Sequence, residues 1–234
     1  MPYKTLAPAI ASMTPMTAPI RPSKTAGLAK TSGLGLEREL LAKAAGYSCI
    51  AGLDEVGRGP LAGPVVSAAV VLDLDNVPQG LADSKALSAQ RREGLFAHIL
   101  ATAKVGIASV SHAEIDTINI RQASLLAMCR AMAALPCTPD MAFVDGNDPP
   151  HLPCATEAVV KGDSRIASIA AASIVAKVVR DRMMARLGAA YPAYGFASNA
   201  GYSTKTHLQV LASDGPCPFH RLSFSPLRQG LLDL

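Results

Sequence analysis

The stretch AGLDEVGRGPLAGPVVSAAVVL, residues 51–72, decides the fold class of this chain. Val65–Leu72 is apolar except for Ser67, as in a strand buried on both faces, and Tyr47–Leu53 predicts a second strand beside it. Two carboxylates, Asp54 and Glu55, follow the earlier strand. Neighbouring strand residues point to opposite faces, so this pair can share one ion only if the chain bends or bulges there. The stretch therefore predicts the centre of a sheet with acidic residues at one edge.

A glycine-flanked arginine comes directly after the acidic pair. Gly57 and Gly59 make a bend easy and leave the main chain open to a substrate, and Arg58 offers a fork of donors suited to phosphate. This is the pattern expected of a metal-dependent site that acts on a phosphate backbone. The alternative is a strand-end turn with a solvated acidic pair, and the pair taken alone favours that alternative.

The composition is that of a folded α/β protein of 234 residues. Hydrophobic residues make up 50% and aromatic residues 4%, with no Trp, so the core is aliphatic and stacking on several bases is not expected. The net charge of +4 lies entirely in residues 1–36, which contain no acid, so a nucleic acid would have to be held by a local groove. Five cysteines without a CxxC pair indicate a reducing compartment, and no apolar run reaches the length of a membrane span. A soluble, cytoplasmic protein is expected.

The chain divides into a tail and one domain. Residues 1–35 are rich in Pro, Ala, Thr and Ser and predict a disordered tail, and residues 36–234 form the folded domain. The expected elements, in chain order, are a helix opening at residues 34–40, strands at 47–53 and 65–72, a helix at 88–103, a strand at 105–110, a capping box at Ser111 and Glu114, a helix at 118–134, strands at 142–145 and 158–161, and a long helix from 166.

Three of the expected strands end in acids: Asp54 with Glu55, then Asp145, then Asp163. Carboxylates gathered at one sheet edge repel each other unless divalent cations neutralise them, and all-oxygen ligands select Mg²⁺ or Mn²⁺. Two such ions could activate a water and stabilise the departing oxygen of a phosphodiester. Each acid also has a simpler explanation, because Asp145 can make an Asp-Gly turn, and Asp163 or Ser164 can cap the helix that follows.

Other common catalytic signatures do not occur. The sequence contains no GxSxG, Walker or GxGxxG motif. The histidines have no metal-like spacing and are expected in loops or on the surface, with His207 and His220 as candidate exceptions.

Several motifs in order show that the chain resembles bacterial ribonuclease HII, a family with the ribonuclease H-like fold. The resemblance runs from about Leu36 to Arg228 and includes DEVGRGPLAGPVV at 54–66, DSKALS at 83–88, VDGN at 144–147, VVKGDSRIASIAAASIVAKVVRD at 159–181, GYSTKTH at 201–207 and HRLSFSP at 220–226. It implies a mixed five-stranded sheet flanked by helices, with a helical C-terminal segment.

The resemblance also implies an endonuclease that cuts the RNA strand of RNA–DNA hybrids and incises at single ribonucleotides in duplex DNA. Asp54, Glu55, Asp145 and Asp163 would be its catalytic carboxylates around Mg²⁺ or Mn²⁺. By the same resemblance, the main chain of Gly57, Arg58 and Gly59 would contact the ribonucleotide, and Tyr202 would pack on the deoxyribose beyond it. Lys85 and Lys161 each stand beside a motif acid, and from that position they are expected to contact phosphates. From the residues alone, Tyr202 could be a packing residue, and either lysine a solvated charge.

Two features depart from the resemblance or extend it. Ser198-Asn199-Ala200 stands where many members have a His-Lys pair, which affects affinity more than chemistry. Residues 1–35 do not resemble the folded extra domain of ribonuclease HIII, so ribonuclease HII is preferred. Some relatives carry a C-terminal segment that binds a sliding clamp, for which residues 229–234, QGLLDL, are the candidate. A monomer is expected.

Two rival functions remain open at this point. The first is a catalytically silent nucleic-acid-binding protein on the same fold, against which the four acids argue, because clustered negative charge does not help to bind phosphate. The second is a related metal-dependent nuclease or resolvase with another substrate.

Overall fold

The structure, a computed structural model, describes residues 34–230. A mixed five-stranded sheet forms the centre of this part of the chain. The strands lie in the order β3-β2-β1-β4-β5, with β1 in the middle. β1 is antiparallel to β2 and parallel to β4. β3 is antiparallel to β2, and β5 is parallel to β4. The bounds are β1 Ile50–Val56, β2 Val65–Val71, β3 Lys104–Val110, β4 Met141–Asp145 and β5 Ala155–Val159. The expected fold class is confirmed.

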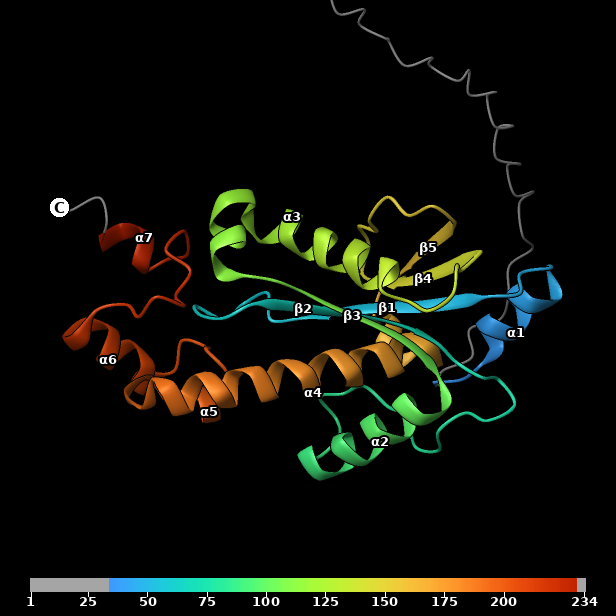
Figure 1. Cartoon of the computed structure of the whole chain (residues 1–234), viewed down its shortest axis with the longest axis horizontal. Coiled ribbons are helices and arrows are strands. Elements are labelled where there is room, and N and C mark those ends of the chain that lie inside the picture. Colours follow the sequence, from blue (N-terminus) through green and yellow to red (C-terminus); the bar gives the residue numbers. More distant parts are fainter. Residues whose placement is uncertain (1–33, 231–234) are drawn as a thin grey trace, which may run out of the picture. The chain divides into compact units, whose positions relative to one another are not determined.

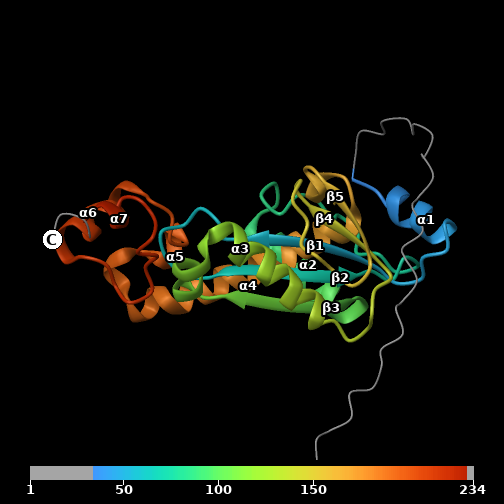
Figure 2. The ribbon, with the colours of Figure 1, turned by 90° about the horizontal axis from the view of Figure 1, so that it is seen from above.

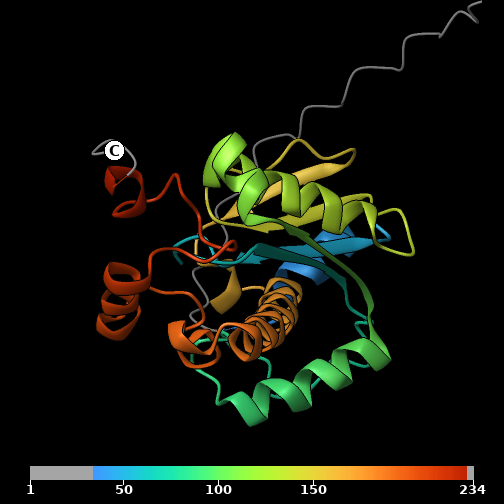
Figure 3. The ribbon, with the colours of Figure 1, turned by 60° about the vertical axis from the view of Figure 1, so that its left-hand side comes forward.

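Helices cover both faces of this sheet. Figure 1 and Figure 3 show α3 on one face and α2 and α4 on the other, and Figure 2 gives the view from above α3. The helices are α1 Glu37–Ala44, α2 Ala89–Thr102, α3 His112–Ala133, α4 Ala167–Ala190, α5 Phe196–Asn199, α6 Lys205–Asp214 and α7 Leu227–Gly230, with short 3₁₀ helices η1 Gly162–Ser164 and η2 Pro192–Tyr194. The helical C-terminal segment, α5 to α7, is also as expected.

The long helix α4 packs directly on the central strand. Most of its first half is buried alanine, serine, isoleucine and valine, and its neighbours across the interface are β1 and β2. At Gly52 a Cβ atom would come within 2.2 Å of the Ser168 carbonyl carbon, so only glycine lets the helix backbone approach this closely. The glycine in β1 therefore sets how tightly α4 lies along the strand.

The start of α4 is capped from a distant part of the sequence. Glu39 of α1 is buried, and its Oε1 accepts hydrogen bonds from the N–H and hydroxyl of Ser168, at 2.8 and 2.9 Å. The residue preceding α4, Ile166, makes no side-chain cap. The expectation that Asp163 or Ser164 caps this helix is wrong, because both lie in η1, before the helix begins.

Three local predictions need correction. β1 pairs with β2 in unbroken register through Val56, so the chain bends after the acidic pair, at Gly57, and not at the pair itself. The last strand covers 155–159 and not 158–161, because Lys161 already has the left-handed φ of 55°. The helix expected at 118–134 begins earlier, at His112, because the expected capping box at Ser111 is present and α3 continues from it through a kink at Asn119, where φ is 66°.

Residues 1–33, the bulk of the expected tail, and residues 231–234 lie outside the described residues. Gly35, at the end of the expected tail, already pairs with Ile166. None of the helices found between residues 34 and 230 combines the length and apolarity needed to cross a membrane.

Candidate active site

The four predicted carboxylates lie at the ends of three neighbouring strands. Leu53 pairs with Val144 on the parallel strands β1 and β4, so the next residues, Asp54 and Asp145, come side by side. Asp163 reaches the same edge from η1, just after β5, and Glu55 follows Asp54 in β1. The structure therefore brings together the acids that the sequence placed at strand ends.

These carboxylates affect one another's ionisation. Burial raises the pKa of Asp54 well above its usual range, and the charges of Glu55 and Asp145 raise it further. Burial also raises the pKa of Glu55 and of Asp163, and Asp145 adds to both shifts. Asp54 and Asp163 are only 6% and 7% exposed. Burial and mutual repulsion therefore both disfavour the charged forms of the carboxylates at this edge of the sheet.

Each acid has a partner within the chain. The N–H of Glu55 donates to Asp54 at 2.7 Å, and the N–H of Gly162 donates to Asp145 Oδ1 at 2.6 Å. Arg58 Nη1 lies 3.1 Å from Glu55 Oε1. With the side chains in these positions, no three His, Cys, Asp or Glu residues between 34 and 230 are grouped so as to hold a metal ion.

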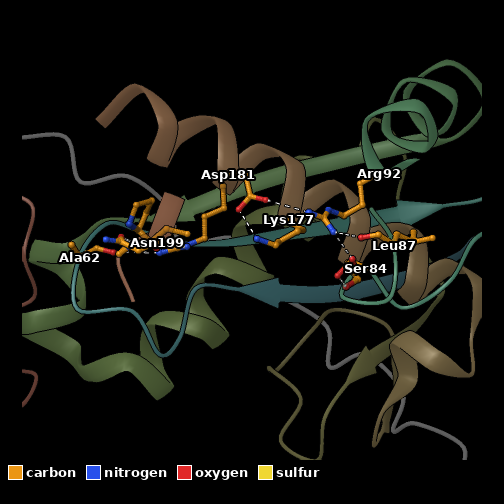
Figure 4. Close-up of polar contacts among 12 residues, drawn as sticks. Ala62, Ser84, Leu87, Arg92, Lys177, Asp181 and Asn199 are labelled. Carbon is orange, nitrogen blue, oxygen red and sulfur yellow. Dashed lines mark hydrogen bonds and ion pairs between the residues drawn. The ribbon is translucent and has the colours of Figure 1, made fainter. Parts of the chain in front are cut away.

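The loop that carries Lys85 is fastened to α2 and α4. Figure 4 shows Arg92 reaching the carbonyls of Ser84 and Leu87, at 2.9 and 2.5 Å, while Asp181 accepts from Lys177 at 2.6 Å. The Ser84 hydroxyl also lies 2.8 Å from that of Ser173 in α4. These contacts hold the loop beside the acidic edge.

Lys85 is the cation that this loop brings to the acids. Its Nζ lies 3.7 Å from Asp163 Oδ2, with the side chain 80% exposed. Partial burial lowers the pKa of Lys85, but the carboxylates of Asp163, Asp83, Asp54 and Asp145 outweigh it and raise the pKa overall. A charged amine facing both the acids and solvent is well placed to meet an anionic substrate. Lys161, the other predicted lysine, is exposed in the left-handed turn before η1.

The glycine-arginine-glycine turn, residues 57–59, follows β1 directly. Gly57 has φ 98°, and a Cβ there would come within 2.1 Å of Arg180 Nε, so only glycine fits. At Gly59 a Cβ would make an ordinary contact of 3.5 Å with Tyr202 Cε1. Arg58 and Gly59 are exposed, whereas Gly57 is buried. The turn thus presents its second half to solvent next to the acids.

Tyr202 lies against this turn, as its proximity to Gly59 shows, and is 48% exposed. The loop before it is held by Asn199, whose amide donates to the Tyr194 carbonyl at 2.7 Å and whose Oδ1 accepts from the N–H of Gly201 at 2.8 Å. Asn199 therefore has a structural role here. The turn therefore touches Tyr202 at Gly59 and Glu55 at Arg58.

Four polar residues that are buried around this turn were not predicted from the sequence to belong to the site. Arg180 and Arg221 each donate to three main-chain carbonyls, and His207 and His220 form a buried pair. The histidines were singled out as exceptions to a surface location, and they are buried. The arginines stand in the motif stretches at 159–181 and 220–226, which was the only signal available in the sequence.

The sequence matches the family model described as Ribonuclease HII over residues 51–226. A ribonuclease HII of Xanthobacter autotrophicus is 57% identical over 202 residues, which cover 86% of this chain and 81% of that protein. A ribonuclease HII of Rhizobium meliloti is 60% identical over 185 residues, which cover 79% and 86% respectively.

Solved structures agree with this match. The ribonuclease H2 of Pyrococcus horikoshii superposes with a TM-score of 0.67 at 27% identity, covering 78% of this chain and 96% of that one. The ribonuclease HII of Archaeoglobus fulgidus, solved in complex with PCNA, gives 0.63 at 28% identity, covering 80% and 100%. Bst-RNase HIII in complex with Mn²⁺, at 20% identity, covers 83% of this chain and 72% of that one and shares the fold with a TM-score of 0.58. The chain therefore belongs to the ribonuclease HII family and is a ribonuclease H hydrolase.

Proposed function

We propose that this enzyme cuts the RNA strand of RNA–DNA hybrids and incises duplex DNA on the 5′ side of a single ribonucleotide, using two divalent cations. The observation that supports it is the position of the acidic edge: Asp54 lies near the end of β1 beside Asp145, and the exposed turn at 57–59 follows that strand and contacts Tyr202. The acidic edge, which would cut the phosphodiester, and the turn at 57–59, which would recognise the sugar, are thus only a few residues apart in the chain.

The acidic edge fits divalent cations by its chemistry. Asp54, Glu55, Asp145 and Asp163 would hold them, because their donors are all carboxylate oxygens, which suit Mg²⁺ or Mn²⁺. Burial is the main cause of the raised pKa values of Asp54 and Asp163, and repulsion from neighbouring carboxylates adds to both, so divalent cations would relieve that repulsion. When bound, the ions would lower the pKa of a water and stabilise the departing oxygen. Sharing an ion requires side chains such as Glu55, now paired with Arg58, to exchange their present partners.

The residues around the acids would bind and orient the nucleic acid. Lys85, held beside Asp163 by its anchored loop, would contact a phosphate next to the one that is cut. Arg58 would turn its guanidinium from Glu55 to phosphate once cations neutralise the carboxylates. Lys161, exposed next to η1, would contact the backbone on the Asp163 side. Binding through these groups should weaken as the salt concentration rises.

Recognition would combine a hydrogen bond and a steric test. The 2′-hydroxyl is the group that distinguishes RNA from DNA at a single position, and the exposed main chain of Arg58 and Gly59 can approach it closely. The ring of Tyr202 would pack on the next sugar and leave no space for a hydroxyl there. Together the two contacts would read a junction from RNA to DNA.

The deciding experiment is cleavage of a duplex DNA that contains one ribonucleotide, with and without Mg²⁺ or Mn²⁺. An all-DNA duplex and a long RNA–DNA hybrid serve as controls. We expect metal-dependent cutting on the 5′ side of the ribonucleotide, cutting of the hybrid, and no cutting of the all-DNA duplex.

The other outcomes separate the rivals. Cutting of the hybrid alone would mean a ribonuclease H without junction recognition. Cutting of the all-DNA duplex would favour the related nuclease or resolvase with another substrate. Binding without cutting of either ribonucleotide-containing substrate would favour the catalytically silent binding protein.

We also propose that residues 229–234, QGLLDL, bind a sliding clamp. The support is the Archaeoglobus fulgidus relative, whose structure is a complex with PCNA. The last four of these residues lie outside the described part of the chain. Deleting residues 229–234 should abolish clamp binding in a pull-down and leave cleavage of a short duplex unchanged, and unchanged clamp binding would contradict the proposal.

The expected setting is a monomer in the reducing cytoplasm. All five cysteines are free thiols, including Cys49 and Cys137, whose sulfur atoms lie 3.5 Å apart. Free thiols at this spacing persist where glutathione and thioredoxin keep cysteines reduced. Size-exclusion chromatography with light scattering and fractionation of cells would test the two statements separately.

A further inference from the structure

The guanidinium of Arg221 is fully buried and holds three main-chain carbonyls. Nη2 donates to Gly57 at 2.6 Å, Nη1 to Arg58 at 2.9 Å and Nε to Gly63 at 2.9 Å. It forms no ion pair with any residue in the described part of the chain, and its exposed fraction is 0%. Burying a charge without a carboxylate partner is costly, so this arrangement calls for a reason beyond packing.

These hydrogen bonds set the direction of two peptide planes. In a trans peptide the carbonyl of one residue and the N–H of the next point in opposite directions. Since Arg221 draws the carbonyls of Gly57 and Arg58 inward, the N–H groups of Arg58 and Gly59 must face the other way. Neither N–H donates to another residue between 34 and 230, and both residues are exposed. Two adjacent donors are therefore left free beside the acidic edge.

We propose that Arg221 is a positioning residue for ribonucleotide recognition, which turns the N–H groups of Arg58 and Gly59 outward to meet the 2′-hydroxyl and the adjoining phosphate. The inference rests on the proposed function and assigns to Arg221 the orientation of the group that reads RNA. It makes no contact with the nucleic acid itself, because it lies beneath the turn.

Arg180 supplies a matched comparison. It is 1% exposed and also donates to three carbonyls, those of Pro64, Ala62 and Ala200, at 3.0, 3.3 and 3.0 Å. These carbonyls belong to the far side of the 57–64 loop and to the segment before Tyr202. Arg180 therefore braces the same region without fixing the peptide planes of residues 57–59.

The test compares Arg221→Lys with Arg180→Lys in the full chain. The dissociation constants for a duplex with one ribonucleotide and for the same all-DNA duplex are measured without Mg²⁺ or Mn²⁺, so that neither is cut. We expect wild type to prefer the ribonucleotide duplex. Arg221→Lys should reduce that preference by about tenfold, the effect of losing a well-oriented hydrogen bond. Arg180→Lys should weaken binding of both duplexes by the same factor.

The outcomes separate the inference from the function on which it rests. If wild type shows a preference and both variants weaken the two duplexes equally, Arg221 is only a structural brace and the inference is overturned while the function stands. If wild type shows no preference, ribonucleotide recognition itself is wrong, and the inference fails with it.

A measurement on wild type covers the case in which Arg221→Lys does not fold. With ¹⁵N-labelled arginine and glycine, the amide signals of Arg58 and Gly59 should shift more with the ribonucleotide duplex than with the all-DNA duplex. Gly94, exposed in α2, serves as the internal reference. Equal shifts of both amides with the two duplexes would overturn the proposal.

Discussion

The Nε2 atoms of His207 and His220 lie 2.9 Å apart in the protein interior. The N–H of Cys217 donates to His220 Nδ1 at 2.9 Å, so the proton of that ring is on Nε2 and points at His207. His207 then carries its own proton on Nδ1 and donates it to the Tyr202 carbonyl at 2.8 Å. Two neutral imidazoles thus form a chain of donors that ends on the main chain of the proposed recognition tyrosine.

Protonation would break this chain, because two N–H groups would then face each other. Burial lowers the pKa of His220 from 6.5 to about 4. Between pH 4 and pH 6.5, His220 is protonated in the unfolded chain and neutral in the folded one. The stability that neutral His220 contributes is therefore present above about pH 6.5 and is lost as the pH falls toward 4.

We predict that His220→Gln makes stability less sensitive to acid. The difference in the free energy of unfolding between pH 7.5 and pH 5 should be about 2 kcal/mol smaller than in wild type. Urea unfolding at the two pH values measures it. Identical pH dependence in the two proteins would show that His220 is not held neutral by the fold.

Asp54→Asn should abolish cleavage without unfolding the protein. The variant loses a proposed cation ligand, which should reduce the rate at least about a hundredfold. Because burial raises the pKa of Asp54 and nearby carboxylates raise it further, a neutral amide should leave the metal-free protein as stable as wild type or more so at pH 7. Activity assays and thermal melts without divalent ions check both statements. Asp145→Asn should lose activity in the same way.

Asp148→Asn is the matched control for these two variants. Asp148 lies three residues after Asp145 but pairs with Arg121, at 2.7 Å, on an exposed surface. Its replacement should leave the cleavage rate within about twofold of wild type, because an exposed ion pair contributes about 0–1 kcal/mol. A similar loss in Asp148→Asn and Asp54→Asn would argue for a general charge effect.

Replacing either of two glycines in one turn by alanine should have different effects, a loss of stability at Gly57 and a loss of cleavage rate at Gly59. Gly57→Ala puts a Cβ 2.1 Å from Arg180 Nε at a φ of 98°, so we expect the free energy of unfolding to fall by about 2–4 kcal/mol. Gly59→Ala meets only Tyr202 at 3.5 Å and should fold normally but cleave the ribonucleotide duplex more slowly. Chemical denaturation and cleavage kinetics distinguish them. If Gly59→Ala were the less stable protein, the exposed placement of its turn would be wrong.

Tyr202→Ala should reduce junction cleavage while leaving stability nearly unchanged. The side chain is 48% exposed, so its removal should cost less than about 1 kcal/mol of folding free energy. Loss of the surface that packs on the sugar should raise KM for the single-ribonucleotide duplex about tenfold. Tyr202→Phe keeps the ring and should retain most activity. Equal kinetics for Tyr202→Ala and wild type would remove Tyr202 from the recognition surface.

Local signals in the sequence predicted most of the fold. The largely apolar β2 and the capping box at Ser111 and Glu114 depend on neighbouring residues, and the structure has both. The cap of α4 could not be found in this way, because Glu39 reaches Ser168 from 129 residues away. The strand predicted at 158–161 lies too far along the chain, because the first residues of β5 are only half-buried and have no strand pattern in the sequence.

The acids of the site were predictable because each lies close to the end of a strand, whereas their supporting residues were not. Arg221 donates to carbonyls up to 164 residues away, and main-chain acceptors leave no mark in a sequence. His207 and His220 are brought together only by the packing of the C-terminal segment. Such contacts between distant residues become visible only when the fold is known.

The close packing of α4 on β1 has a consequence for the accuracy of cutting. Successive residues of β1 and of the turn after it contact successive turns of α4. The pairs in contact are Gly52 with Ser168, Asp54 with Ser173, and Gly57 with Arg180. The distance from Asp54 to the turn at 57–59 is therefore set by their contacts with one unbroken helix. Under the proposed function, α4 acts as a ruler: a one-residue insertion between Ser173 and Arg180 would rotate everything beyond it by about 100°. In that case the place of the cut would be fixed by helix geometry and not by a flexible loop.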